Sequence, residues 1–227
     1  MTQDPRSSNG RPRSWLEDLL GQDVPNARIL TYGYATDGIT NYRYLVRNVL
    51  YGRALDLVQE LAVQRSKDGT SKRPIFFIAH SLGGWIVKRG LIISKEASEL
   101  PLRDVELSTC GVAFFGTLSP GRPSSPSPLA NVIRRTSFPV SEDARIRTKS
   151  FQSASSIIPQ QQQDVSDETW LENQMEAFKG ITANLPRLSF YETKQSGDSF
   201  VVEKRHSMVG SNGMQVPLTS THAELVK

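Results

Sequence analysis

Apolar residues recur at helical spacing in three stretches of the chain, and each stretch predicts an amphipathic helix. The first covers about residues 43–66, the second runs from Gly84 to about Glu96, and the third has Asp167 and Glu168 in its first turn. The two carboxylates suit the positive end of a helix dipole. The apolar positions in these patterns are Val46, Leu50, Ala54, Leu57, Val58 and Leu61, then Trp85, Ile86, Val87, Leu91 and Ile92, then Trp170, Leu171, Met175, Phe178 and Ile181.

Short apolar runs between these helices predict strands. Residues 75–79 (IFFIA) and 110–115 (CGVAFF) are apolar at nearly every position, which is typical of strands buried on both faces of a sheet. Further strands are expected at 27–34 (ARILTYGY), 188–191 and 200–202. Strands that alternate with helices at this spacing imply a parallel sheet, so we expect an α/β fold.

Two segments have compositions that do not favour regular structure. Residues 1–14 are polar and contain two prolines, which predicts a disordered arm, and no apolar run follows that would make a secretory signal. Residues 118–165 include a Pro- and Ser-rich stretch and a run of glutamines, which predicts an insertion or lid. We expect the rest, 15–227, to form a single domain.

Composition excludes several function classes. The chain has 227 residues, a formal charge of +4 and 37% hydrophobic residues, and its apolar runs fall far short of the roughly 20 that a membrane helix needs. The single cysteine, Cys110, excludes an internal disulfide and favours a reducing compartment. Three scattered histidines lack metal-ligand spacing, so we expect no metal and no cofactor. Basic residues do not alternate with aromatic ones, which gives no support to nucleic-acid binding.

The clearest chemical motif is AHSLGG, residues 79–84, which stands between a predicted strand and a predicted helix. This is the setting of a nucleophile elbow, a sharp turn that lifts its central side chain above the sheet. Ser81 is the central residue, and the small Ala79 and Gly83 let the two backbones approach. The alternative is a tight turn without catalysis, but such a turn does not need a serine at its apex.

A serine nucleophile needs a histidine base, which follows the nucleophile in this fold. His80 adjoins Ser81, so we expect its side chain to point away from the serine. This leaves His206 and His222, and the polar loop around His222 is far enough past residue 202 to reach the edge of the sheet. The competing interpretations are an exposed polar residue for His206 and a helix-start residue near the chain end for His222.

The base in turn needs a carboxylate to orient it. Glu192 comes at the end of the predicted strand 188–191, which is where the fold places the acid. Asp198 and Glu203 are alternatives, because both lie in the segment that follows and both could reach a histidine. For all three, the simpler interpretation is a solvated surface charge.

Several segments of the chain follow one family pattern: TYGY at 31–34, RPIFFIAHSLGGWIVK at 73–88, GVAFFGT at 111–117, RLSFYET at 187–193, and VVEK followed by THAELVK. Together they resemble the lipase-like α/β-hydrolase domain of the serine active site containing protein family. The resemblance covers about residues 15–227; related domains open many fungal NACHT and ankyrin-repeat proteins, and GPI inositol-deacylases are more distant. It implies a lipase- or esterase-like serine hydrolase with Ser81 as nucleophile and His222 as base, acting on a lipid or other ester. It also implies an intracellular protein in peripheral contact with mitochondrial or endoplasmic reticulum membranes.

The chain departs from this family pattern in three ways. Leu118 and Ser119 stand where relatives have Pro-His. The usual first strand and its His-Gly-rich loop are missing before Trp15. That loop ordinarily gives the second oxyanion N–H, so the N–H of Leu82 is the one assignable oxyanion donor. Losing one such donor costs about 10²- to 10³-fold in rate. The sequence stops at Lys227, where relatives continue. We therefore expect a fragment that lacks a downstream domain.

Two function hypotheses follow from these observations. The first is a serine ester hydrolase that acts through an acyl-Ser81 intermediate with His222 as general acid and base. The second is a catalytically degenerate hydrolase domain that serves as an interaction or effector module of a receptor-like protein. The elbow motif favours the first hypothesis, and the missing oxyanion loop favours the second.

Overall fold

The computed structural model describes residues 15, 20–34, 42–118, 167–202, 204 and 213–226. The chain divides into two compact units, residues 1–34 together with 227, and residues 35–226. The predicted arm, nearly all of the predicted insertion, and the candidates Glu203 and His206 lie outside the described residues. The boundaries expected for the arm and the single domain stay predictions.

The first unit contains one short helix, α1 (Gly21–Asp23), within its described residues. A turn follows, in which the N–H of Ala27 donates to the carbonyl of Val24 at 2.9 Å. The strand predicted at 27–34 is wrong, because this segment has no regular secondary structure. A β-branched and aromatic composition makes a strand only where a neighbouring strand completes its hydrogen bonds, and the described sheet does not include this segment.

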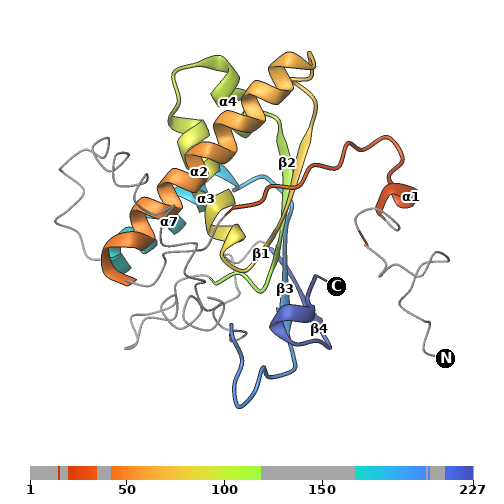
Figure 1. The fold of residues 1–227 in the computed structure, drawn as a ribbon, viewed down its shortest axis with the longest axis vertical. Coiled ribbons are helices and arrows are strands. Elements are labelled where there is room, and N and C mark those ends of the chain that lie inside the picture. The colour runs from red at the N-terminus through yellow and green to blue at the C-terminus, as the bar shows by residue number, and fades with distance from the viewer. Residues whose placement is uncertain are drawn as a thin grey trace, which may run out of the picture. The chain divides into compact units, whose positions relative to one another are not determined.

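The second unit is built on a sheet of four parallel strands in the order β1-β2-β3-β4 (Figure 1). Since all four run the same way, their carboxyl ends meet at one edge of the sheet. The expected α/β class is confirmed by this sheet and the helices packed on it. The strands are β1 (Ile75–His80), β2 (Thr109–Phe115), β3 (Arg187–Glu192) and β4 (Met214–Leu218).

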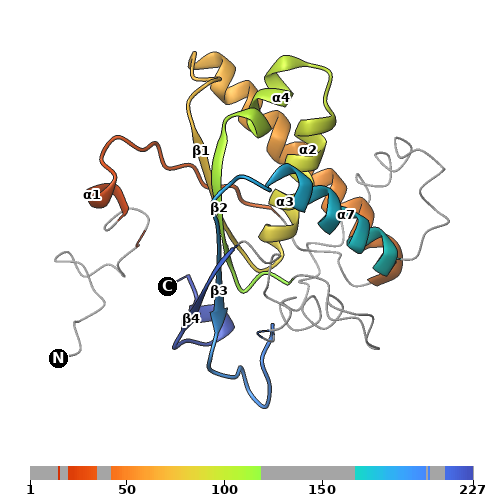
Figure 2. The same cartoon turned by 180° about the vertical axis from the view of Figure 1, so that it is seen from behind.

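The three predicted helices are confirmed as α2 (Tyr42–Lys67), α3 (Gly83–Glu96) and α7 (Asp167–Ile181). A fourth, α4 (Leu100–Leu107), was not predicted; Pro101 lies in its first turn, where a missing N–H costs nothing. These four helices lie on the same face of the sheet (Figures 1 and 2). None of the helices in the described residues combines the length and the apolar character that crossing a membrane requires.

The hydrophobic core lies between these helices and the sheet. Val58 and Ala62 of α2 pack with Val105 of α4 against Ile75 and Phe77 of β1. On the other face of β1 lie Phe76 and Ile78, which are 47% and 39% exposed, so the prediction that this strand is buried on both faces is wrong. No helix among the described residues of this unit covers that face.

The end of the chain differs from the prediction. The strand expected at 200–202 is wrong, because these residues form a bend in which the N–H of Val202 donates to Glu192 Oε1 rather than to a neighbouring strand. The last strand is instead β4, which contains Pro217. Proline cannot donate a backbone hydrogen bond, and β4 pairs only with β3 in the described sheet, an edge position that tolerates it.

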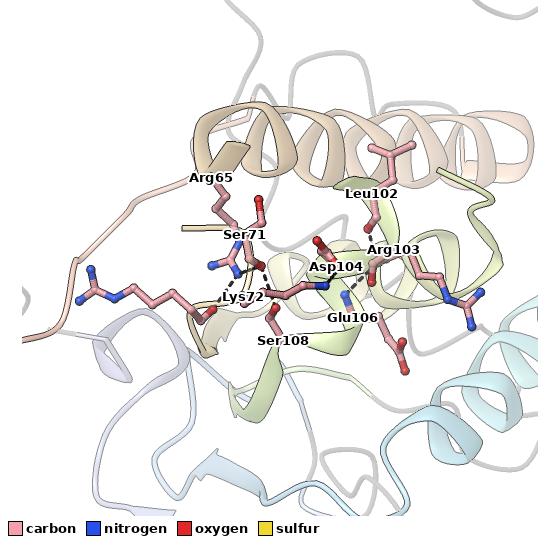
Figure 3. A network of polar contacts seen from close by, with 10 residues as sticks. Arg65, Ser71, Lys72, Leu102, Arg103, Asp104, Glu106 and Ser108 are labelled. Carbon is pink, nitrogen blue, oxygen red and sulfur yellow. Dashed lines mark hydrogen bonds and ion pairs between the residues drawn. The ribbon is translucent and has the colours of Figure 1, made fainter. Parts of the chain in front are cut away.

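A polar network at the amino end of β1 joins the preceding loop to α2 and α4 (Figure 3). The Arg65 guanidinium donates to the carbonyl of Ser71 at 2.5 Å, and the Ser108 hydroxyl donates to the same carbonyl at 3.0 Å. Lys72 Nζ lies 2.6 Å from Asp104 Oδ1. These bonds fix the loop that enters β1 at the amino end of that strand.

Candidate active site

Ser81 occupies a strained turn between β1 and α3. Its φ is +52°, which makes it the one non-glycine residue with positive φ among those described. Its side chain sits directly beyond β1, and Leu82 precedes the first residue of α3. A residue with a Cβ in this conformation costs about 1–3 kcal/mol, a strain that persists only where the surroundings impose it. Strand, strained serine and helix make up the geometry of a nucleophile elbow.

The turn is fixed to the carboxyl end of β2. The N–H of Ser81 donates to the carbonyl of Phe115 at 2.9 Å, and the Thr117 hydroxyl donates to the carbonyl of Ser81 at 3.1 Å. Gly84 lies so close to Thr117 that any Cβ at position 84 would collide with the Thr117 side chain. The sequence pointed to Ala79 and Gly83 as the small neighbours, whereas the structure makes Gly84 the glycine that allows the close approach.

His222, near the carboxyl end of the sequence, lies close to the turn that holds Ser81. It begins the short 3₁₀ helix η5 (His222–Glu224), and it is buried, with 4% of its surface exposed. Its ring lies directly over Gly116, where an added Cβ would come within 2.8 Å of His222 Nδ1 and Cε1. Because Gly116 follows Phe115, which accepts the Ser81 N–H, His222 lies beside the elbow.

Glu192, the last residue of β3, is the carboxylate beside His222. Its Oε2 lies 3.1 Å from His222 Nδ1, close enough for an ion pair, although the alignment is not that of a hydrogen bond. Its Oε1 accepts the N–H groups of Val201 and Val202 at 2.5 and 2.8 Å. Both side chains of the pair are almost fully buried, so the low local dielectric strengthens their attraction.

Besides Glu192 Oε2 and His222 Nδ1, two more buried polar atoms at this site have no hydrogen-bond partner among the described residues. They are Ser81 Oγ and His222 Nε2. Leaving a buried polar atom unpaired costs about 1–3 kcal/mol. Catalytic hydrogen bonds are often long or misaligned without substrate and tighten only in the complex. The structure therefore brings Ser81, His222 and Glu192 together without joining the serine to the histidine.

His80 contributes a contact that the sequence did not indicate. Its ring lies against that of His222, with centroids 4.8 Å apart, and its Nε2 is 3.0 Å from the His222 carbonyl oxygen. Burial lowers the pKa of His80, and the positive charge that His222 can carry lowers it further. Because 142 positions separate the two residues, no spacing rule could have revealed the contact.

The other candidates are placed differently. Leu82 is 8% exposed and stands at the start of α3, where the first N–H groups of a helix have no partner within it. Asp198 is exposed in the loop after β3. Within the described residues, no group of His, Cys, Asp and Glu is arranged to hold a metal ion.

A buried lysine lies behind the elbow on α3. Lys88 is fully buried, with its Nζ 4.9 Å from the ring centroid of Trp85 and 5.0 Å from that of Phe114. The same Nζ donates to the carbonyl of Leu118 at 3.4 Å. Burial lowers the pKa of this amine to about 7.

Comparison with known proteins gives a partial match. No protein-family model matches the sequence, and no solved structure matches it significantly. Protein SERAC1 of Danio rerio is 33% identical over 105 residues, which are 46% of this chain and 15% of that protein. Protein SERAC1 of Mus musculus and that of Homo sapiens are each 30% identical over 105 residues, 44% of this chain and 15% of those proteins. Over somewhat less than half its length, the chain is thus a distant homologue of protein SERAC1, and it spans about 15% of these relatives.

Proposed function

We propose that this chain is a serine hydrolase that cleaves carboxylic esters through an acyl-Ser81 intermediate. The observation that carries the proposal is the left-handed backbone of Ser81, φ +52°, at the turn between β1 and α3. A turn alone would be easier to make with glycine, so a serine held there against strain indicates a use for its hydroxyl. The buried pair of His222 and Glu192 beside the turn supports the same reading.

The reaction uses these side chains in a fixed order. Ser81 Oγ attacks the ester carbonyl carbon while His222 Nε2 takes its proton, and the imidazolium then protonates the departing alcohol. Glu192 faces Nδ1, which leaves Nε2 as the nitrogen available to the serine. Water then attacks the acyl-enzyme while His222 takes its proton, and as the acid leaves, the imidazolium returns that proton to Ser81 Oγ. The N–H of Leu82, at the start of α3, donates to the oxyanion in both steps.

A lipid ester is the substrate class we favour. This preference comes from the resemblance to the lipase-like family and from the homology to protein SERAC1 over less than half of the chain. The strands of the sheet are apolar because they are buried, which explains folding and carries no information on the ligand.

A fluorophosphonate probe tests the proposal, because it reacts with an activated serine whatever the substrate. Intact mass spectrometry should show a single adduct on the chain, absent from Ser81→Ala and strongly slowed in His222→Gln. Ser98→Ala, which alters an exposed serine, is the matched control and should label like the parent chain. An adduct that persists in Ser81→Ala, or a folded parent chain that does not react, would contradict the proposal.

The second candidate function is a non-catalytic interaction module. It is favoured by the missing hydrogen bond between Ser81 Oγ and His222 Nε2, both of which lack partners among the described residues. The same labelling experiment separates the two functions. A folded parent chain whose mass does not change on treatment, as the mass of Ser81→Ala should not, is the outcome expected of the module.

A further inference from the structure

We infer that His80 is a positioning residue that holds His222 in place for the reaction. The inference rests on the proposed function, since it assigns to His80 a role toward the base of that same site. Two contacts carry it: the hydrogen bond from His80 Nε2 to the His222 carbonyl at 3.0 Å, and the packing of the two rings at 4.8 Å.

The hydrogen bond fixes the tautomer of the neutral His80 ring. A carbonyl oxygen can only accept, so Nε2 of His80 must carry the hydrogen. In the neutral ring this leaves Nδ1 as the unprotonated nitrogen, and in the cation Nε2 still carries its hydrogen. The bond to His222 is therefore kept in both protonation states.

His222 has little local structure of its own to hold it. The helix η5 contains only three residues, closed by the capping box of Thr221 and Glu224 and by a bond of 3.4 Å from the Leu225 N–H to the His222 carbonyl. Such a short 3₁₀ turn has poor hydrogen-bond geometry. The bond from His80 anchors this turn to the end of β1, one residue before the nucleophile, so it couples the backbone of the base to the elbow.

The electrostatics keep His80 from competing as a base. Burial is the largest cause of its lowered pKa, followed by repulsion from His222, while the bond to the His222 carbonyl and the charge of Glu192 oppose them. His222 has Glu192 at 3.1 Å to stabilise its positive charge, whereas the partner of His80 is a neutral carbonyl. The proton from Ser81 thus goes to His222, and His80 stays a neutral donor.

Two substitutions separate the hydrogen bond from the bulk of the ring. His80→Gln keeps an N–H near the position of Nε2, and His80→Leu keeps apolar volume without a donor. We expect the fluorophosphonate labelling rate of Ser81 to fall about tenfold to a hundredfold in His80→Leu, as for a misplaced catalytic group, and to stay within about threefold of the parent in His80→Gln. Unfolding midpoints, measured alongside, show whether both variants are folded at the assay temperature.

Equal labelling rates in the parent chain and a folded His80→Leu would overturn the inference, and so would equal losses in both variants. Histidine ring ¹⁵N NMR gives a readout that needs no activity, because the chain has only three histidines and His206→Gln and His222→Gln assign them. We expect His80 as the Nε2–H tautomer, with His222 signals that broaden or shift in His80→Leu. An Nδ1–H tautomer of His80 would refute the contact. A parent chain that does not label contradicts the proposed function, and the NMR result still decides the contact.

Discussion

Replacing Lys88 with methionine should stabilise the protein, by an amount that depends on pH. Lys88 Nζ is enclosed by the rings of Trp85, Phe114 and Phe178, at 4.9, 5.0 and 6.0 Å from their centroids. Burial lowers the pKa of its amine from 10.5 to about 7. Methionine has a similar length and no charge, so it fits an apolar site without the cost of removing an ammonium group from water.

The magnitude follows from proton linkage. Between pH 7 and 10.5 the unfolded chain keeps a proton on Lys88 that the folded chain has lost, so stability rises with pH in this window. At about 1.4 kcal/mol for each pH unit, the cost of burying the charged amine amounts to about 5 kcal/mol below pH 7 and vanishes above pH 10.5. Methionine also loses the bond to Leu118 and the cation–π contacts, worth about 2 kcal/mol together, so we expect a net gain of about 2–3 kcal/mol at pH 7.

Urea unfolding of the parent chain and Lys88→Met at pH 6, 7, 8 and 9 measures this difference. The difference in unfolding free energy should fall by about 2 kcal/mol between pH 7 and pH 9, because the parent chain recovers stability as the amine deprotonates. Lys95→Met is the control, since Lys95 lies on the same helix with 45% of its side chain exposed, and its effect should stay near zero at every pH.

A difference that does not change between pH 6 and 9 would refute the reasoning, whatever its sign. It would mean that the Lys88 amine keeps its ordinary protonation in the folded chain, so that its charge is stabilised as well as in water. A difference that grows with pH would contradict the sign of the linkage.

Two further predictions concern the site. Glu192→Gln should lower the Ser81 labelling rate by about 10²- to 10⁴-fold, because a neutral amide cannot stabilise charged His222. The loss of stability should be small, since the amide oxygen can still accept from the N–H groups of Val201 and Val202. A change in labelling rate below threefold would contradict an orienting role for Glu192. Gly116→Ala should lower the unfolding free energy by about 1–3 kcal/mol and slow the labelling of Ser81. The φ of +54° disfavours a side chain at this position, and the new Cβ would meet the His222 ring at 2.8 Å. Thermal unfolding and labelling measure the two effects, and unchanged values would contradict this placement of His222.

The elements that the sequence predicted correctly have local hydrophobic signals. The helices α2, α3 and α7 each bury a stripe of apolar side chains, and the strands β1 and β2 are apolar at nearly every position. Periods of 3.6 residues and unbroken apolar runs can be read without knowing the neighbours. These elements therefore follow from the sequence alone.

The missed elements depend on contacts instead. Helix α4 has eight residues and buries only Asp104 and Val105, so it carries almost no apolar stripe. Strand β4 has five residues and a proline, and its pairing with β3 defines it. Conversely, residues 200–202 have strand-like composition, yet two of their N–H groups bind the Glu192 carboxylate. In each case, tertiary contacts determine the secondary structure that the local sequence propensity does not specify.

The site was partly predictable because parallel strands align their ends. In the register of the sheet, His80 lies opposite Phe115, and Phe115 lies opposite Phe190. Ser81 and Glu192, which come just after these positions, must therefore lie along the same edge of the sheet. The sequence already suggests this, because both residues stand at the ends of predicted parallel strands. Register does not determine what crosses that edge. The placement of the His222 ring over Gly116, and of His80 against that ring, depends on the path of the last segment after β4, so only the folded chain could supply it.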